Sequence, residues 1–91
     1  MNKKIYLQKL EWEWKTFCSD MTNTSRENLF CMAQMIAAKK RIYDLLSRVE
    51  EFSEEELRLL LSMEHMIDSL YMNLPKKAVA YRVADIKQVL I

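Results

Sequence analysis

Hydrophobic residues recur at spacings of three and four along most of this chain, which is the period of an α-helix. In the segment 25–51, Met35, Ala38, Ile42 and Leu45 follow this spacing and share one helix face. A second apolar stripe runs beside the first, through Leu29, Met32, Ile36, Tyr43 and Leu46. Two stripes need neighbours on two sides. The pattern therefore predicts a long central helix over 25–51, started by a capping box from Thr24 to Glu27.

Start and stop signals divide the rest of the chain into three further helices. Ser53 and Glu56 form a second capping box, which predicts a helix over 54–73. Pro75 ends that helix and suits the first turn of another over 76–89. The N-terminal helix is expected over 3–19. Short connections favour a compact antiparallel all-α bundle of four helices, 3–19, 25–51, 54–73 and 76–89.

Folding the chain at the polar connection 20–23 gives an expected register between the first two helices. Trp14 would lie beside Met35 or Ile36, and Phe17 beside Met32. The inward stripe of the third helix would run through Leu60, Met63, Ile67, Leu70 and Leu74.

Composition supports one small helical domain over 1–91. The chain has 91 residues, no glycine and one proline, and a sheet protein would need more turn residues. A core this small leaves room for a partner or a second copy to add stability. No apolar run approaches the length of a membrane span, and the N-terminus does not resemble a signal peptide. Two cysteines without a C-x-x-C pattern predict a cytoplasmic protein with buried free thiols.

Residues that could perform chemistry are sparse. His65 is the single histidine, and its neighbour Ser62 at i−3 lacks a pocket and an oxyanion site. Glu64 and Asp68 are spaced to share a cation, but the sequence places no second carboxylate-rich helix opposite them. Phosphate loops and zinc ligand spacings are also missing. We therefore expect no catalytic residues, cofactor, metal or small-molecule substrate.

Exposed apolar residues point instead to a protein partner. Trp12 cannot share a face with the inward Trp14, and it lies with Ile5 on the side of the first helix that otherwise looks polar. Leu59 and Met66 widen the apolar stripe of the third helix beyond what one neighbour would cover. These four residues predict a protein interface in a homodimer or with another protein. The alternative for Trp12 is burial under the fourth helix or a chain end.

By analogy with other small helical proteins, we expect an adaptor or inhibitor of a larger bacterial or phage assembly.

The competing hypothesis is a small nucleic-acid-binding transcriptional regulator. Its contacts would come from the basic residues of the second and fourth helices, namely Lys39, Lys40, Arg41, Lys76, Lys77, Arg82 and Lys87. The net charge of +1 is low for such a protein. A solvated basic face is the other interpretation of these residues.

Overall fold

The computed structural model describes residues 3–75 and 80–91, and within them every regular element is helical. In chain order these elements are α1 (Lys3–Thr22), α2 (Arg26–Cys31), α3 (Ala33–Leu46), the 3₁₀ turn η1 (Val49–Glu51), α4 (Glu54–Ser62), α5 (Met66–Asn73) and α6 (Val83–Val89). The all-α prediction is confirmed, but the described residues hold more helices than the four that the sequence predicts, because the predicted helices over 25–51 and 54–73 are each divided.

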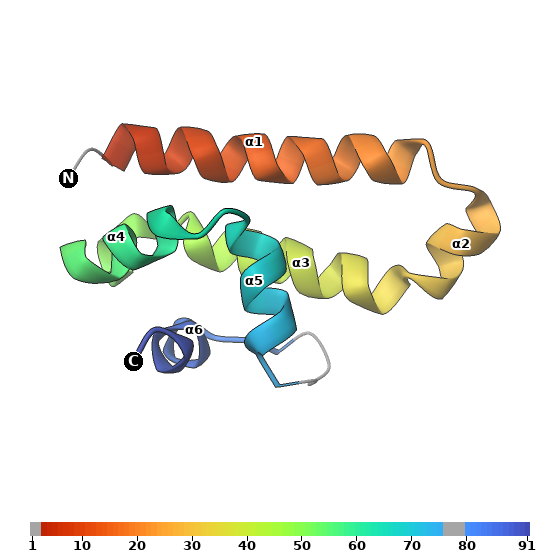
Figure 1. Cartoon of the computed structure of the whole chain (residues 1–91). Coiled ribbons are helices and arrows are strands. Elements are labelled where there is room, and N and C mark those ends of the chain that lie inside the picture. Colours follow the sequence, from red (N-terminus) through yellow and green to blue (C-terminus); the bar gives the residue numbers. More distant parts are fainter. Residues whose placement is uncertain (1–2, 76–79) are drawn as a thin grey trace.

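The longest elements, α1 and α3, lie side by side and run in opposite directions (Figure 1). α4, α5 and α6 gather over one half of this pair, and α2 lies at its other end (Figure 1). α4 packs against α1, α5 crosses both α1 and α3, and α6 packs on α5. The Cα trace is elongated, with extents of 41 × 25 × 18 Å.

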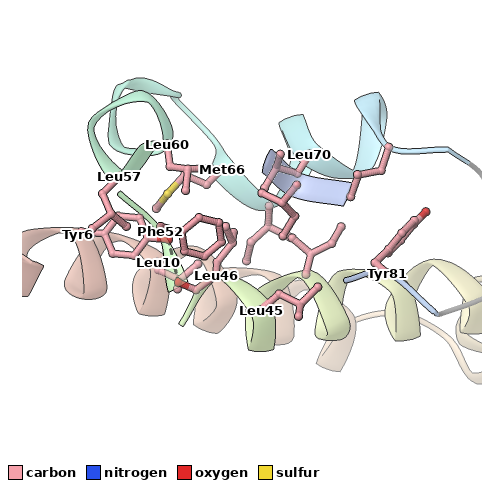
Figure 2. Packing of buried hydrophobic residues seen from close by; sticks show 14 of the residues in the cluster. Tyr6, Leu10, Leu45, Leu46, Phe52, Leu57, Leu60, Met66, Leu70 and Tyr81 are labelled. Atoms are coloured by element: carbon pink, nitrogen blue, oxygen red, sulfur yellow. Dashed lines mark hydrogen bonds between the residues drawn. The ribbon is translucent and has the colours of Figure 1, made fainter. Parts of the chain in front are cut away.

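The hydrophobic core lies where α4, α5 and α6 meet the α1–α3 pair (Figure 2). Fully buried side chains come from all of these helices and from the segment before α6: Tyr6, Leu10, Ile42, Leu45, Leu46, Leu57, Leu60, Met66, Leu70, Tyr81 and Ile86. The Tyr6 hydroxyl donates to the carbonyl oxygen of Leu46 at 2.8 Å. This bond satisfies a carbonyl at the end of α3 that the helix itself leaves free.

The prediction of one continuous helix over 25–51 is wrong. The chain leaves α-helical geometry at Met32 (φ −97°, ψ 6°) and again at Arg48 (φ −83°, ψ 66°). Ser25, and not Thr24, caps α2 by accepting from the amide of Asn28 at 3.2 Å. α2 has no fully buried residue, so little tertiary packing holds it in line with α3.

The expected register between α1 and α3 is also wrong. Trp14 stacks on Tyr43 with ring centroids 5.1 Å apart, and therefore lies about two turns farther along α3 than predicted. The cause is the longer connection. α1 continues to Thr22, and α2 takes up residues that the sequence assigns to the paired helix.

The predicted third and fourth helices also differ from the observed ones in where they begin and end. The segment 54–73 is broken between α4 and α5, where Met63 and His65 are extended (φ −71°, ψ 137° and φ −134°, ψ 98°). The start at Glu54 is confirmed, with the full Ser53–Glu56 capping box. Residues 76–79 of the predicted helix over 76–89 lie outside the described part, and within 80–89 the helix covers only Val83–Val89.

Candidate functional site

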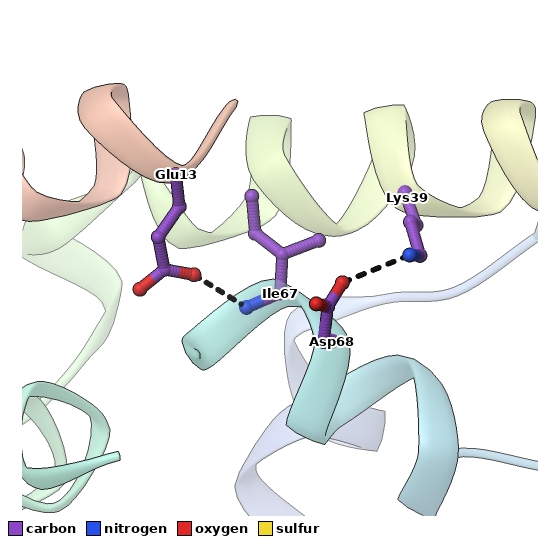
Figure 3. Close-up of polar contacts among 4 residues, drawn as sticks. All are labelled: Glu13, Lys39, Ile67 and Asp68. Carbon is purple, nitrogen blue, oxygen red and sulfur yellow. Dashed lines mark hydrogen bonds and ion pairs between the residues drawn. The ribbon is translucent and has the colours of Figure 1, made fainter. Parts of the chain in front are cut away.

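Two charged side chains of α1 hold the bend between α4 and α5. The Lys9 ammonium donates to the carbonyl oxygens of Leu61 and Met63 as α4 ends. One turn farther along α1, a Glu13 carboxylate oxygen accepts from the amide of Ile67 at 3.1 Å, in the first turn of α5 (Figure 3). The positive side chain thus meets the negative end of one helix, and the negative side chain meets the positive end of the next.

α5 depends on this contact because its own first residues do not cap it. His65 precedes the helix and makes no side-chain capping bond. Glu13 supplies the missing acceptor from another helix, and its side chain is 7% exposed. The bend is therefore produced by tertiary contacts, and the local sequence contains no proline or glycine that would cause it.

The bend leaves a groove beside α1. Figure 1 shows α4 running toward the middle of α1 and α5 turning away from that direction. Beyond the turn lies a groove of about 350 Å³ between α1, the start of α3 and the start of α5. Its apolar lining comes from all three sides: Trp12, Phe17, Met21, Met32, Met35 and Ile67. This volume is within the range of small ligand sites.

The apolar side chains of the groove are only partly covered. Trp12 is 59% exposed and stands at its rim. Phe17, Met21, Met32 and Met35 are half-buried, whereas the inward residues at the other end of α1 are fully buried. The groove is thus an apolar surface that the chain itself leaves open.

The polar lining contains one ion pair. The Lys39 ammonium lies 2.8 Å from an Asp68 carboxylate oxygen (Figure 3). The Lys39 side chain is only 12% exposed, and its nitrogen also lies 4.8 Å from the centroid of the Phe17 ring. Lys39 is therefore neutralised and held against the groove wall.

Two other carboxylates that line the groove, those of Asp20 and Glu13, form no ion pair with a described basic residue. Asp20 lies near the C-terminal end of α1, and within 3–75 and 80–91 its carboxylate has no hydrogen-bond or ion-pair partner. The second oxygen of Glu13 is buried, again without a partner among the described residues. Figure 3 shows this oxygen directed away from the Lys39–Asp68 pair.

Three of the four residues predicted for a protein interface are exposed. Ile5 is 52% exposed, Trp12 59% and Leu59 48%, and of these Trp12 lines the groove. The placement of Met66 on an open face is wrong, because it is fully buried in the core. The bend makes Met66 the first residue of α5 and turns its side chain inward.

The basic residues predicted for nucleic-acid contact on α3 are engaged within the chain. Lys39 is paired as described above, and Lys40 lies 2.8 Å from Asp44. This hydrogen bond raises the pKa of Lys40 above its usual value. The Arg41 side chain donates to the carbonyl oxygen of Tyr81 at 2.9 Å, and so fixes the segment before α6.

Lys87, a predicted basic residue near the C-terminus, is also paired within the chain. Lys87 lies 3.3 Å from Glu56, and so joins α6 to α4. Arg82 is exposed, and Lys76 and Lys77 lie outside the described residues. Of the seven predicted residues, the five that the structure describes are therefore not gathered on one free basic surface.

Neither a metal centre nor a membrane helix is found in the described part of the chain. No group of three or more histidine, cysteine, aspartate or glutamate residues there could hold a metal ion. No helix described there is long and apolar enough to cross a membrane. Cys18 and Cys31 are free and exposed, so the prediction of buried thiols is wrong.

Sequence reasoning missed the roles of Lys9 and Glu13. A usable signal existed, because Glu13 falls between Leu10 and Phe17 on the inward side of α1, where an apolar residue is expected. A charged residue at such a position needs a buried partner.

Comparisons with known proteins give no functional assignment. No protein-family model, no curated protein and no solved structure matches this chain. The function must therefore be argued from the site itself.

Proposed function

We propose that this chain is a non-enzymatic protein-interaction module, of the adaptor or inhibitor type, that binds a helical segment of a partner protein in the groove beside α1. The observation that carries the proposal is the open apolar groove rimmed by Trp12. α4 ends at the bend and α5 turns away from its direction, so a bound helix would cover the part of the α1–α3 pair that they leave open. Helix-in-groove binding is a common mode of protein recognition.

The lining suits a protein partner. Met21, Met32 and Met35 are flexible, polarizable side chains that adapt to the shape of a bound helix. Tryptophan is enriched among the residues that dominate binding energy, and Trp12 offers a large exposed surface at the rim. By contrast, the internal pairing of Lys39, Lys40 and Arg41 counts against the nucleic-acid hypothesis.

The homodimer predicted from the sequence is the case in which the bound segment comes from a second copy. Light scattering over a concentration series tests it directly. A mass that doubles with concentration in the parent protein, and does not in Trp12→Ala, would place the dimer contact at the groove. A constant monomer mass would assign the groove to a different protein. We further expect function in the reducing cytoplasm, where exposed Cys18 and Cys31 stay free.

A titration with a model helix tests the proposed site. The probe is a synthetic amphipathic peptide of about five helical turns, with leucine at helical spacing and glutamine at its flanking polar positions. Two-dimensional ¹H–¹⁵N NMR should show shifts for the Trp12 indole and for amides near Met32 and Met35. Trp12→Ala should weaken binding about tenfold or more, as expected when a large aromatic anchor is removed.

The matched control is Phe30→Ala, which removes another exposed aromatic side chain. Phe30 is 84% exposed and does not line the groove, so its removal should leave the peptide affinity unchanged. Equal losses in the two variants, or shifts confined to other surfaces, would contradict the groove as the binding site.

A further inference from the structure

The charges that line the groove carry information about its occupant. Three carboxylates, those of Glu13, Asp20 and Asp68, face one ammonium, that of Lys39, which leaves a formal charge of −2 with His65 neutral. Resting on the proposed function, we propose that the groove selects an amphipathic helix that carries lysine or arginine beside its apolar stripe. The geometry points to Asp20 as the residue that meets this cation.

Asp20 is placed against the local preference of its helix. It lies near the C-terminal end of α1, where the helix dipole is negative, and no basic residue occupies the last turn. A carboxylate there is unfavourable for the isolated helix, and no described residue compensates it. The carboxylate and the negative end of the helix dipole together form a negative potential at the mouth of the groove.

Glu13 makes a smaller contribution to this potential from the wall of the groove. One of its oxygens caps α5, and the other is buried without a partner among the residues described. Lys9 does not offset it by a direct ion pair, since its ammonium binds the carbonyl oxygens of α4. Because the free oxygen is directed away from the Lys39–Asp68 pair that lines the groove, a cation there would be attracted mainly by Asp20 (Figure 3).

The same charges reject acidic helices. A helix with glutamate beside its apolar stripe would bring like charges together at Asp20, and such contacts oppose binding. The N-terminal turn of α4, with Glu54, Glu55 and Glu56, is a segment of this type. The groove therefore discriminates against the α4 of a second copy, and it favours a basic helix of a different protein.

Three peptides test the charge preference. They share one apolar stripe and differ only at the flanking polar positions, which carry lysine, glutamine or glutamate. We expect the lysine peptide to bind most tightly and the glutamate peptide least, with about a threefold to fivefold change in Kd at each step. Raising the salt concentration should shrink these differences and leave the glutamine peptide almost unaffected.

The variant Asp20→Asn tests whether Asp20 is responsible for the preference for the lysine peptide. This change keeps the size of an exposed side chain, so the fold should be unaffected. It should lower the preference for lysine over glutamine to nearly one and leave the affinity for the glutamine peptide unchanged. The matched control is Glu55→Gln, an exposed carboxylate of α4 outside the groove, which should leave all three affinities as they are.

The outcomes separate this inference from the proposed function. Equal binding of the three peptides at the groove would overturn the charge preference and leave the docking site standing. Tighter binding of the glutamate peptide would overturn it as well. Binding of no peptide would contradict both proposals. A dimer that buries Trp12 and excludes every peptide would assign the groove to a second copy. It would overturn the proposal that a basic helix of a different protein binds there.

Discussion

The two halves of the α1–α3 pair differ in how well they are covered. In the half that holds Tyr6 and Leu46, α4, α5 and α6 close the core and both side chains are fully buried. In the half that holds Met21 and Met32, no described helix covers the pair beyond the start of α5, and both methionines stay half-buried. The bend at Met63–His65 marks the boundary.

This difference separates stability from binding within one small chain. Burial free energy is concentrated in the closed half, because it scales with the apolar area removed from water. The open half contributes less to stability and keeps its apolar surface for a partner. Binding regions are commonly drawn from the less stable parts of a protein.

The largest contrast is expected between two methionines. Met66→Ala removes a fully buried side chain from the closed half and should lower the free energy of unfolding by about 2–5 kcal/mol. Met35→Ala, at a half-buried position in the open half, should cost about 1 kcal/mol or less but weaken peptide binding. Urea denaturation measures the first effect and NMR titration the second. Equal stability losses would remove the distinction between the two halves.

The boundary itself is tested at Glu13. Glu13→Ala leaves the Ile67 amide without its acceptor and should cost about 1–3 kcal/mol. The control is Glu11→Ala, which breaks an exposed pair with Lys15 and should cost about 0.5 kcal/mol or less. Chemical denaturation of both variants measures the difference. If Glu11 proved the more costly of the two, Glu13 would not hold the bend.

Tyr6 extends the comparison to alkaline pH. Tyr6→Phe should cost about 1–2 kcal/mol, because it leaves the buried Leu46 carbonyl without its donor. Burial, with the Glu13 charge as a second cause, raises the pKa of Tyr6 above its usual value. The unfolded chain therefore loses this proton first, and stability should fall as pH rises above about 10. Thermal unfolding between pH 8 and about 11 should show a smaller decline in Tyr6→Phe.

The smallest effects are expected at two helix caps. Ser53 caps α4 in the closed half, and Ser53→Ala should cost about 1 kcal/mol. Ser25 caps α2, which has no buried residue, so Ser25→Ala should change global stability by at most a few tenths of a kcal/mol. Hydrogen exchange should report the second change locally, as faster exchange of α2 amides. A global loss for Ser25→Ala equal to that for Ser53→Ala would show that α2 is part of the cooperative core.

Local patterns predicted the helical content and missed its division. The apolar period and the Ser53–Glu56 capping box depend on near neighbours, and both are confirmed. The bend between α4 and α5 depends on Lys9 and Glu13, more than fifty positions earlier in the chain. No reading of the segment 54–73 alone could reveal it.

The candidate site also has one part that the local sequence predicts and another that depends on distant contacts. The exposure of Trp12 could be predicted, because the phase of one helix determines which of two nearby tryptophans faces inward. The groove could not be predicted, since it exists only where α5 turns away. The error at Met66 has the same origin, because a straight helix would have pointed this side chain outward.

The contacts of Lys9 and Glu13 also imply an order of events during folding. The residues from Glu54 to Asn73 contain no helix breaker, so in isolation they favour one continuous amphipathic helix. Docking on α1 replaces that local preference with a bent form, a case of frustration between near and distant interactions. Because contacts that span many residues form late, we expect the bend to appear after the folding transition state. The groove is then the last part of the molecule to take shape.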